Sequence, residues 1–440
     1  MSILSRIGSL GRNTVPGVAL AIAVAAPLAG QYRPTAITNV NIVPMNRETV
    51  LENMTIVVRN GVIESLLPSA DTDLPDNAWV IDADGRYLLP GLTDMHVHVR
   101  TADALELYIA RGFTTVRDMN GFLGDPLGWR AAVQRGDIVG PRLITATARD
   151  VVPVAHGHDL TKVCRTPHES FFALMEGAKK QGIPVAGYIP DRSLTEANVD
   201  GPGFTIDEVA NAGVVSLEHM WEVAGAAAGD HPDGFIRLRE KARELRSSGT
   251  AIATLLMSSL NYNELWVSRG SFFKGKRVKL ANEYTGADGI AAIYRMMDGQ
   301  TDVEPLDRSL LLETLKLFHE EKVDVVIGTD SHGPLEIAGL SAFDEMDLFV
   351  EAGLSPYDAL RAATITPAKV LGRLETSGTV AVGKNADFVL VDGNPLENLD
   401  VLRKPVAVMA QGRWLDRDEL RYILADAIES MTWCPTRSCS

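Results

Sequence analysis

Two kinds of segment alternate through the middle of this chain, from residue 91 to residue 371. Short apolar runs typical of buried strands are followed by longer stretches in which apolar residues recur at helical spacing. Eight strands that each lead into a helix predict an α/β protein with a (β/α)8 barrel. The predicted strands cover residues 92–98, 113–118, 142–147, 160–164, 184–188, 214–219, 250–256 and 323–330.

The third and seventh units of this pattern are unusual in length. Between residues 147 and 159 there is little room for a helix, although a crossover between parallel strands usually needs a dozen or more residues. We therefore expect the third βα unit to be reduced. Residues 257–308, after the seventh strand, form a long insertion, and such a segment at the carboxyl-terminal face of a barrel typically covers the active site.

The two flanks of the barrel region have a different pattern from the middle. Both hold short β-rich runs separated by turns, and Asn60-Gly61 between two apolar runs is a strong hairpin signal. We expect one composite β-sandwich built from residues 31–90 and 372–425, beside a barrel over residues 91–371. Residues 426–440 would form a C-terminal tail.

The first 30 residues have the composition of an export signal. Arg6 and Arg12 precede an apolar run over residues 15–28, which ends in the small residues Ala29 and Gly30. A basic segment, a short apolar region and a small-residue boundary are typical of a secretory signal peptide. We expect a periplasmic or secreted protein with no stable membrane span after processing; a buried N-terminal helix is the alternative.

Composition and charge exclude some classes of partner. Hydrophobic residues at 46% and charged residues at 22% are typical of a soluble globular protein. The net charge of -15 and the lack of a basic patch argue against a nucleic-acid partner. A small-molecule substrate is the expected partner, and the sequence leaves open whether the chain forms a homo-oligomer.

Three cysteines do not amount to a disulfide framework. Cys434 and Cys439 could close a small loop in an oxidising compartment. Cys164 would then remain as a buried thiol.

The first predicted strand of the barrel ends in a pair of histidines. His96 and His98 stand two residues apart, so their side chains share one face of the strand. Two imidazoles on one face can bind a single cation. The alternative is a pair of buried histidines hydrogen-bonded within a core.

Three further strands carry residues that could join these histidines. Lys162 lies in the fourth strand, His219 ends the sixth, and Asp330 ends the eighth. Taken singly, Lys162 could be an ordinary exposed lysine and Asp330 a helix cap. Because catalytic groups of such barrels collect at the carboxyl ends of the strands, these four strands together predict a metal site.

At these residues the chain resembles the amidohydrolase superfamily, in particular its imidazolonepropionase-like and Xaa-Pro dipeptidase-like branch. The resemblance covers about residues 35–425 and implies a metal-bearing TIM barrel beside a composite β-sandwich. The segments that carry it are Pro90-Gly-Leu-Thr-Asp-Met-His-Val-His98, Gly112-Phe-Thr-Thr-Val-Arg-Asp118, Gly140-Pro-Arg142, Ser216-Leu-Glu-His219, Gly328-Thr-Asp330 and Asn385-Ala-Asp-Phe-Val-Leu-Val-Asp-Gly-Asn-Pro395.

The resemblance also implies a role for each strand-end residue. His96 and His98 would bind the more buried of two divalent metals together with Asp330, and His219 would bind the second. Lys162 would be carboxylated, since a carbamate can bridge two metals whereas an ammonium has no lone pair. Asp330 would accept a proton from the metal-activated water and pass it to the leaving nitrogen. Zinc is the expected metal, although these ligands also suit manganese and cobalt.

One position departs from the family pattern. Members commonly have Val-Ala-Gly-His at the fifth strand, where the histidine binds the second metal, whereas this chain has Val-Ala-Gly-Tyr188. A neutral phenol is a poor ligand, although a phenolate could bind. The number of metals, one or two, and the carboxylation of Lys162 therefore stay open.

Other residues near the predicted strand ends admit two interpretations each. His156 and His158 follow the third strand and could recognise a substrate carboxylate or carbonyl, or could be solvated loop residues. His332 could line the pocket or cap a helix. We expect Arg117 and Asp118, at the end of the second strand, to form a structural pair with each other.

The first functional hypothesis is an exported metal-dependent hydrolase of a C–N bond in a small substrate such as a dipeptide or N-acyl amino acid. The second is a catalytically degenerate relative that binds a small molecule or metal without turnover, for which Tyr188 is the main support. Deamination of a heterocycle by a single metal is a third hypothesis. The sequence does not name the substrate, because pocket residues come largely from loops.

Overall fold

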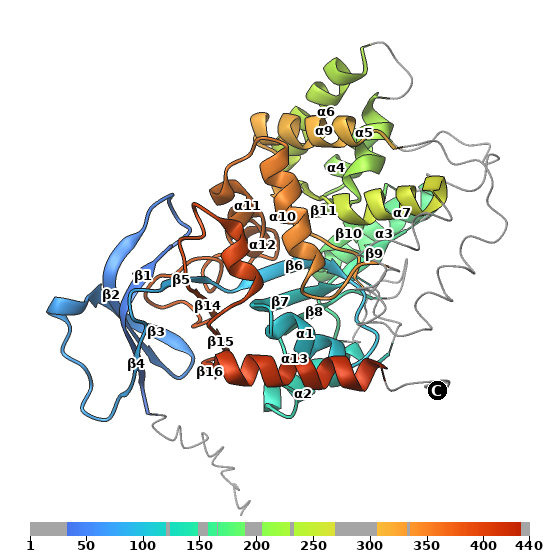
Figure 1. Cartoon of the computed structure of the whole chain (residues 1–440). Coiled ribbons are helices and arrows are strands. Elements are labelled where there is room, and N and C mark those ends of the chain that lie inside the picture. Colours follow the sequence, from blue (N-terminus) through green and yellow to red (C-terminus); the bar gives the residue numbers. More distant parts are fainter. Residues whose placement is uncertain are drawn as a thin grey trace, which may run out of the picture. The chain divides into compact units, whose positions relative to one another are not determined.

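The computed structural model describes residues 33–119, 124–147, 157–164, 166–189, 205–228, 233–268, 306–331 and 335–432 (Figure 1). The predicted signal peptide, the Cys434–Cys439 pair, His156 and His332 lie outside these residues. Within the described ranges, no helix has the length and apolar character to cross a membrane. Cys164 is buried and unbridged, as expected.

One sheet takes strands from both flanks of the barrel region. Its strand order is β16-β15-β14-β5-β1-β2-β3, and β4 pairs with β1. The Asn60-Gly61 hairpin forms between β2 and β3, and both residues adopt the positive φ that a tight two-residue turn requires. The strands are β1 Thr35–Ile42, β2 Leu51–Arg59, β3 Val62–Pro68, β4 Trp79–Asp82, β5 Tyr87–Pro90, β14 Phe388–Val391, β15 Ala407–Ala410 and β16 Arg413–Asp416.

The remaining strands are parallel and lie in the order expected for a TIM barrel. They form one sheet with the order β6-β7-β8 and another with the order β13-β12-β11-β10-β9. Two isolated parallel bridges, Ala146 to Leu160 and Val97 to Ser331, connect the two sheets at both edges. The strands are β6 Leu92–Val97, β7 Phe113–Asp118, β8 Arg142–Thr145, β9 Thr161–Val163, β10 Val185–Gly187, β11 Ser216–Glu218, β12 Ala251–Ala253 and β13 Val325–Val326.

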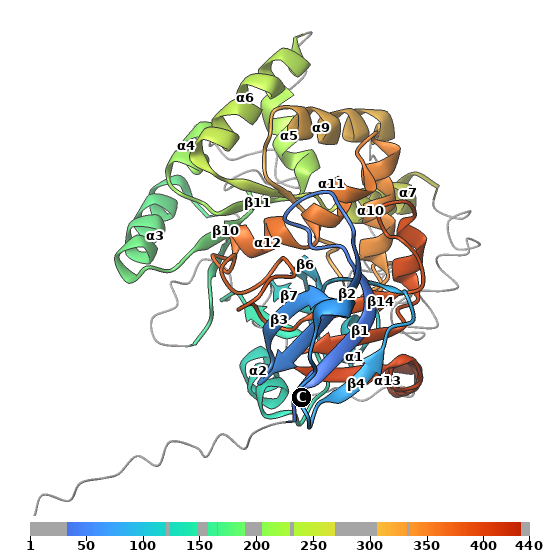
Figure 2. The same cartoon turned by 90° about the vertical axis from the view of Figure 1, so that its left-hand side faces the viewer.

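Helices follow these strands along the chain and lie outside them in both views (Figures 1 and 2). Between β8 and β9, residues 146–147 and 157–160 contain no helix, and the residues between them lie outside the described ranges. The helices are α1 Asp103–Ile109, α2 Pro126–Arg135, α3 His168–Gln181, α4 Ile206–Asn211, α5 Met220–Ala228, α6 Gly234–Ser248, α7 Leu256–Ser268, α9 Arg308–Glu320, α10 Ser341–Glu351, α11 Pro356–Ala362, α12 Ile365–Val370, and the 3-10 helices η1 Ser69–Asp71 and η3 Leu399–Arg403.

The final described helix, α13 (Arg417–Thr432), links the sheet to the barrel. Asp416, the last residue of β16, precedes the helix as its N-terminal cap, because its carboxylate accepts hydrogen bonds from the backbone N–H groups of Asp418 and Glu419. Buried Leu420 packs in one apolar cluster with Ile109 of α1. Because each buried leucine contributes roughly 1.5–3 kcal/mol, α13 is an integral part of the packing and runs through the expected domain end at residue 425.

Candidate metal centre

His96 and His98 lie at the carboxyl end of β6, as the spacing predicts. The His96 side chain has no solvent exposure, and the centroids of the two imidazoles are 5.3 Å apart. Gly328, on the neighbouring strand segment, makes room for His96, since a Cβ at Gly328 would lie 2.8 Å from the His96 Cβ. The two imidazoles therefore emerge together from a tightly packed strand end.

Asp330 is held beside these histidines by the segment that follows β13. The backbone N–H groups of Thr329 and Asp330 both donate to the carbonyl of His96. Asp330 Oδ1 lies 2.8 Å from His98 Nε2 and 3.6 Å from His96 Nε2. The Asp330 backbone has a φ of 61°, a left-handed conformation that persists in a non-glycine residue only where the surroundings impose it.

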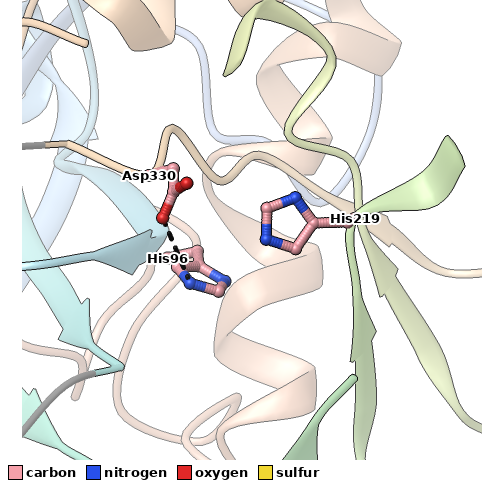
Figure 3. A group of neighbouring side chains, drawn as sticks. All are labelled: His96, His219 and Asp330. Carbon is pink, nitrogen blue, oxygen red and sulfur yellow. Dashed lines mark ion pairs between the residues drawn. The ribbon is translucent and has the colours of Figure 1, made fainter. Parts of the chain in front are cut away.

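His219 completes a cluster of possible metal ligands from three strand ends. It follows β11 directly and also has a positive φ, of 60°. Its imidazole points toward His96 and Asp330 (Figure 3), and one ligand atom of each of the three residues lies within 4.8 Å of the other two. Such a set of two imidazoles and a carboxylate is typical of a site for a divalent metal.

The site also contains Lys162 and Tyr188, which contact each other. Lys162 is 3% exposed, and its Nζ lies 5.1 Å from the centroid of the Tyr188 ring. The Tyr188 hydroxyl is 3.0 Å from His219 Nε2, and the two rings are stacked with their centroids 4.9 Å apart. The structure therefore brings together all six residues predicted from the strand ends: His96, His98, Lys162, Tyr188, His219 and Asp330.

The protonation states favoured by these surroundings suit metal binding. Burial lowers the pKa of both His96 and His219, and the charge of Lys162 lowers each pKa further. Burial alone would raise the pKa of Asp330, but the hydrogen bond from His98 and the nearby imidazoles hold it below its usual range. Burial also raises the pKa of Tyr188, which is therefore a neutral phenol.

Glu218 is a site residue that the sequence analysis did not single out. Its Oε2 lies 2.7 Å from Nδ1 of His96, and both side chains are fully buried. A charged residue inside a buried strand, directly before His219, was the available sequence signal. The expected pair of Arg117 with Asp118 is not the one observed, because the ion pair of Arg117 is with Glu218 at 2.8 Å.

Ser258 of α7 is a second site residue that the sequence did not indicate. Its hydroxyl donates to Asp330 Oδ2 at 3.3 Å.

His158 is the one expected pocket histidine that the structure describes. Its Nδ1 lies 3.1 Å from the Thr145 hydroxyl, which also donates to Asp159 Oδ2. His158 is not part of the cluster of ligand atoms formed by His96, His219 and Asp330. A role in substrate recognition stays a prediction.

Comparison with known proteins identifies the family. The sequence profile described as "Amidohydrolase family" matches residues 87–415, which is more than half of the chain. The chain belongs to the amidohydrolase family. The resemblance expected from the strand-end motifs is thus confirmed, and the matched region includes every member of the metal-ligand cluster.

The curated relatives of this amidohydrolase include an imidazolonepropionase and an adenine deaminase. Imidazolonepropionase of Mesorhizobium japonicum is 27% identical over 379 residues, which cover 78% of this chain and 87% of that protein. Adenine deaminase of Paracoccus denitrificans is 23% identical over 395 residues, which cover 85% of this chain and 57% of that protein. The chain thus spans little more than half the length of the adenine deaminases that it matches.

Solved amidohydrolase structures share the architecture. A Xaa-Pro dipeptidase with bound methionine superposes with a TM-score of 0.63 at 20% identity, covering 87% of this chain and all of the other. Bottromycin amidohydrolase gives a TM-score of 0.67 at 20% identity, with 91% of each chain covered. At this level of identity the likeness shows the fold, a TIM barrel beside a β-rich domain.

Proposed function

We propose that this amidohydrolase is a metal-dependent hydrolase that cleaves a C–N bond of a small substrate, such as a dipeptide or an N-acyl amino acid. The observation that carries the proposal is the convergence of His96, His219 and Asp330 at three strand ends. The relatives support the class of bond, because adenine deaminase, imidazolonepropionase and Xaa-Pro dipeptidase all act on bonds between carbon and nitrogen.

A divalent metal fits the residues that are present. His96 Nε2 and His98 Nδ1 are buried without a hydrogen-bond partner among the described residues, an arrangement that is costly unless a ligand takes them up. We propose zinc, because imidazole and carboxylate ligands at the ends of rigid strands are typical zinc ligands. When bound, the ion would lower the pKa of a water molecule and polarise the substrate carbonyl.

Asp330 is the proposed proton carrier. Its two oxygens face different donors, His98 Nε2 at 2.8 Å and the Ser258 hydroxyl at 3.3 Å. Both contacts favour the carboxylate, the form that can take a proton from the attacking water. The same group can then return the proton to the leaving nitrogen.

The number of metal ions depends on Tyr188. Its neutral phenol contacts the Nε2 atom of His219 and leaves the fifth strand without the usual imidazole ligand. We propose one ion held by His96, His219 and Asp330. His98 would be a further ligand if its Nε2, which donates to Asp330 Oδ1 at 2.8 Å without the ion, turned its lone pair to the metal. A second ion would require carboxylation of Lys162, whose Nζ lies over the Tyr188 ring.

The test is metal stoichiometry on the purified protein, measured for the wild type and for Tyr188→His. We expect one zinc per wild-type chain and two per Tyr188→His chain, because the added imidazole together with carboxylated Lys162 would complete the second site. Two ions in the wild type would contradict the single-metal proposal and leave the hydrolase standing. A chain that binds no metal in either form, and hydrolyses no member of an amide and dipeptide panel, would overturn the proposed function.

A degenerate protein that binds a small molecule or metal without turnover is the second candidate. Tyr188 is the observation that favours it, since loss of a ligand is one route to loss of catalysis. Metal binding without hydrolysis of any amide, dipeptide or amine in the panel would support this candidate over the hydrolase.

Three features of the whole chain remain proposals. We propose that residues 1–30 direct export to the periplasm or the medium and are then removed. We also propose that the parallel strands form a complete (β/α)8 barrel with a reduced third unit. Residues 31–90 and 372–425 would form one β-sandwich domain beside this barrel. N-terminal sequencing of protein recovered from the exported fraction tests the first. Oligomeric state is open and follows from light scattering on the same sample.

A further inference from the structure

The imidazole of His96 has two nitrogens in very different surroundings. Nε2 lies on the side of Asp330, 3.6 Å from its Oδ1, and has no hydrogen-bond partner among the described residues. Nδ1 lies 2.7 Å from Glu218 Oε2, and both side chains are fully buried. The contact with Glu218 therefore determines which nitrogen of His96 can carry a hydrogen.

Glu218 is in turn fixed by donors on its other oxygen. Oε1 accepts hydrogen bonds from the Arg117 guanidinium at 2.8 Å and from the Ser216 hydroxyl at 2.6 Å. Arg117 also donates to the Ser216 hydroxyl at 2.8 Å and to the Met95 carbonyl at 2.6 Å. The guanidinium thus ties β6, β7 and β11 together beneath the metal centre.

The direction of every hydrogen bond in this network follows from the chemistry of its members. A guanidinium only donates, so the Ser216 hydroxyl must accept from Arg117 and can pass its own hydrogen only to Glu218. Oε1 of Glu218 accepts from both Arg117 and Ser216, so the carboxyl group faces donors on this side and has the geometry of an acceptor. Oε2 of the same acceptor carboxylate faces His96 Nδ1 at 2.7 Å, which places the hydrogen of this contact on Nδ1.

We propose that Arg117, Ser216 and Glu218 form a positioning relay that holds His96 in the Nδ1–H form and presents the Nε2 lone pair to the metal. The relay rests on the proposed metal site and assigns these three residues a task within it. Carboxylates that accept from a metal-bound histidine both orient the ring and raise its basicity, and their loss typically weakens metal binding about 10- to 100-fold. Arg117 and Glu218 are therefore positioning residues that never need to touch the substrate.

The decisive variant is Glu218→Gln. Arg117 and Ser216 both donate toward Oε1, so the amide oxygen of glutamine would take that place and the NH2 group would face His96 Nδ1. Nδ1 would then have to accept, which puts the hydrogen on Nε2 and removes the lone pair from the metal side. We expect zinc affinity, measured by competition with a chelator, to fall about 10- to 100-fold.

A second readout separates a tautomer effect from general damage to the site. In metal-free protein labelled with nitrogen-15, the His96 ring should carry its hydrogen on Nδ1 in the wild type and on Nε2 in Glu218→Gln. Glu321→Gln is the matched control, because Glu321, directly after α9, is also paired with arginines, Arg239 and Arg243 of helix α6. The control should leave both the zinc affinity and the His96 tautomer unchanged.

Ser216→Ala keeps the test decisive if Glu218→Gln does not fold. It removes one donor to Glu218 and little volume, and should weaken zinc binding several-fold with the native fold retained. Wild-type protein that binds no zinc would overturn the metal site itself. If the wild type binds zinc, two results would overturn the relay alone. One is a folded Glu218→Gln or Ser216→Ala variant with the zinc affinity of the wild type. The other is a Glu218→Gln variant whose His96 keeps the hydrogen on Nδ1.

Discussion

Buried polar groups at the two ends of the parallel strands differ in whether they have hydrogen-bond or charge partners. At the carboxyl ends, His96 and His98 each keep a buried nitrogen without a partner among the described residues, and His219 and Asp330 adopt left-handed backbone conformations. At the amino ends, a cavity of about 190 Å³ is lined by the beginnings of β6, β7 and β8 and by the segment before β14.

Each charged side chain that lines this amino-end cavity already has an oppositely charged partner, either within the lining or, for Arg373, beside it. Arg142 lies 3.4 Å from Asp387, and Arg373 lies 3.8 Å from Asp159. Polar groups that satisfy each other stabilise the fold, whereas groups held apart from any partner are available to a ligand. We therefore expect the chemistry at the carboxyl ends only. Substitutions there should reduce activity, whereas substitutions at the amino ends should reduce stability.

The largest expected effect is the loss of activity in Asp330→Asn. Asparagine fits the space and tolerates the φ of 61° at this position, but it cannot take a proton. We expect kcat/KM toward the best amide substrate to fall about 100- to 10,000-fold. Thermal unfolding monitored by circular dichroism should change little. Activity within tenfold of the wild type would show that the proton goes elsewhere.

Glu345 of α10 offers a contrast at the carboxyl ends, because it is a buried acidic side chain beside the end of β12 whose two oxygens both accept hydrogen bonds. It accepts hydrogen bonds from the Thr254 hydroxyl and the backbone N–H groups of Leu256 and Met257, and so anchors the start of α7. Burial nevertheless raises its pKa to about 7, against a usual value of 4.5. Between these two pKa values the unfolded chain has released the proton that the folded chain still holds.

Stability should therefore fall as the pH rises through this range. The contribution of Glu345 is fully present below about pH 4.5 and is lost by about pH 7, by up to about 3 kcal/mol. Urea unfolding of metal-free protein at several pH values checks this, and Glu345→Gln should show a flatter profile. Parallel profiles for the two proteins would rule out Glu345 as the source.

The smallest effect is expected at the amino end, for Asp387→Asn. This substitution weakens the pair with Arg142 and leaves a partly buried guanidinium less well matched, so the free energy of unfolding should fall by about 1–3 kcal/mol. The backbone N–H of Gln411 keeps an acceptor, since it bonds the other oxygen of Asp387. Once folded, the variant should retain zinc affinity and kcat/KM within about twofold; a drop comparable to that of Asp330→Asn would break the distinction between the two ends.

The parts of this molecule that local patterns determine were predictable. Asn60-Gly61 predicts its hairpin because the turn requires positive φ, and the period of two in His96 and His98 predicts a shared face. The position of Lys162 and Asp330 at strand ends follows from parallel strands that all point the same way.

The parts that depend on register between distant strands were not predictable. Arg117 and Glu218 are 101 residues apart, and only the closed ring of strands brings them into contact. The sequence suggested that Arg117 and Asp118 form a structural pair at the end of the second strand, yet neighbouring residues on a strand point to opposite faces. Ser258 was missed for a similar reason, since its approach to Asp330 depends on the path of α7.

The pairing of β14 with β5 has a consequence for how the chain is made. Arg86 and Asp392, at one end of this pairing, are 306 residues apart, and Gly91 alone separates β5 from the strand that carries His96. During synthesis β5 emerges early and remains an unpaired edge until nearly the whole barrel has been translated. An open edge of this kind is a site for aggregation, and contacts between such distant segments form slowly. A chain whose synthesis stopped after α12 would thus contain all the parallel strands β6 to β13 but leave the edge of β5 exposed to aggregation.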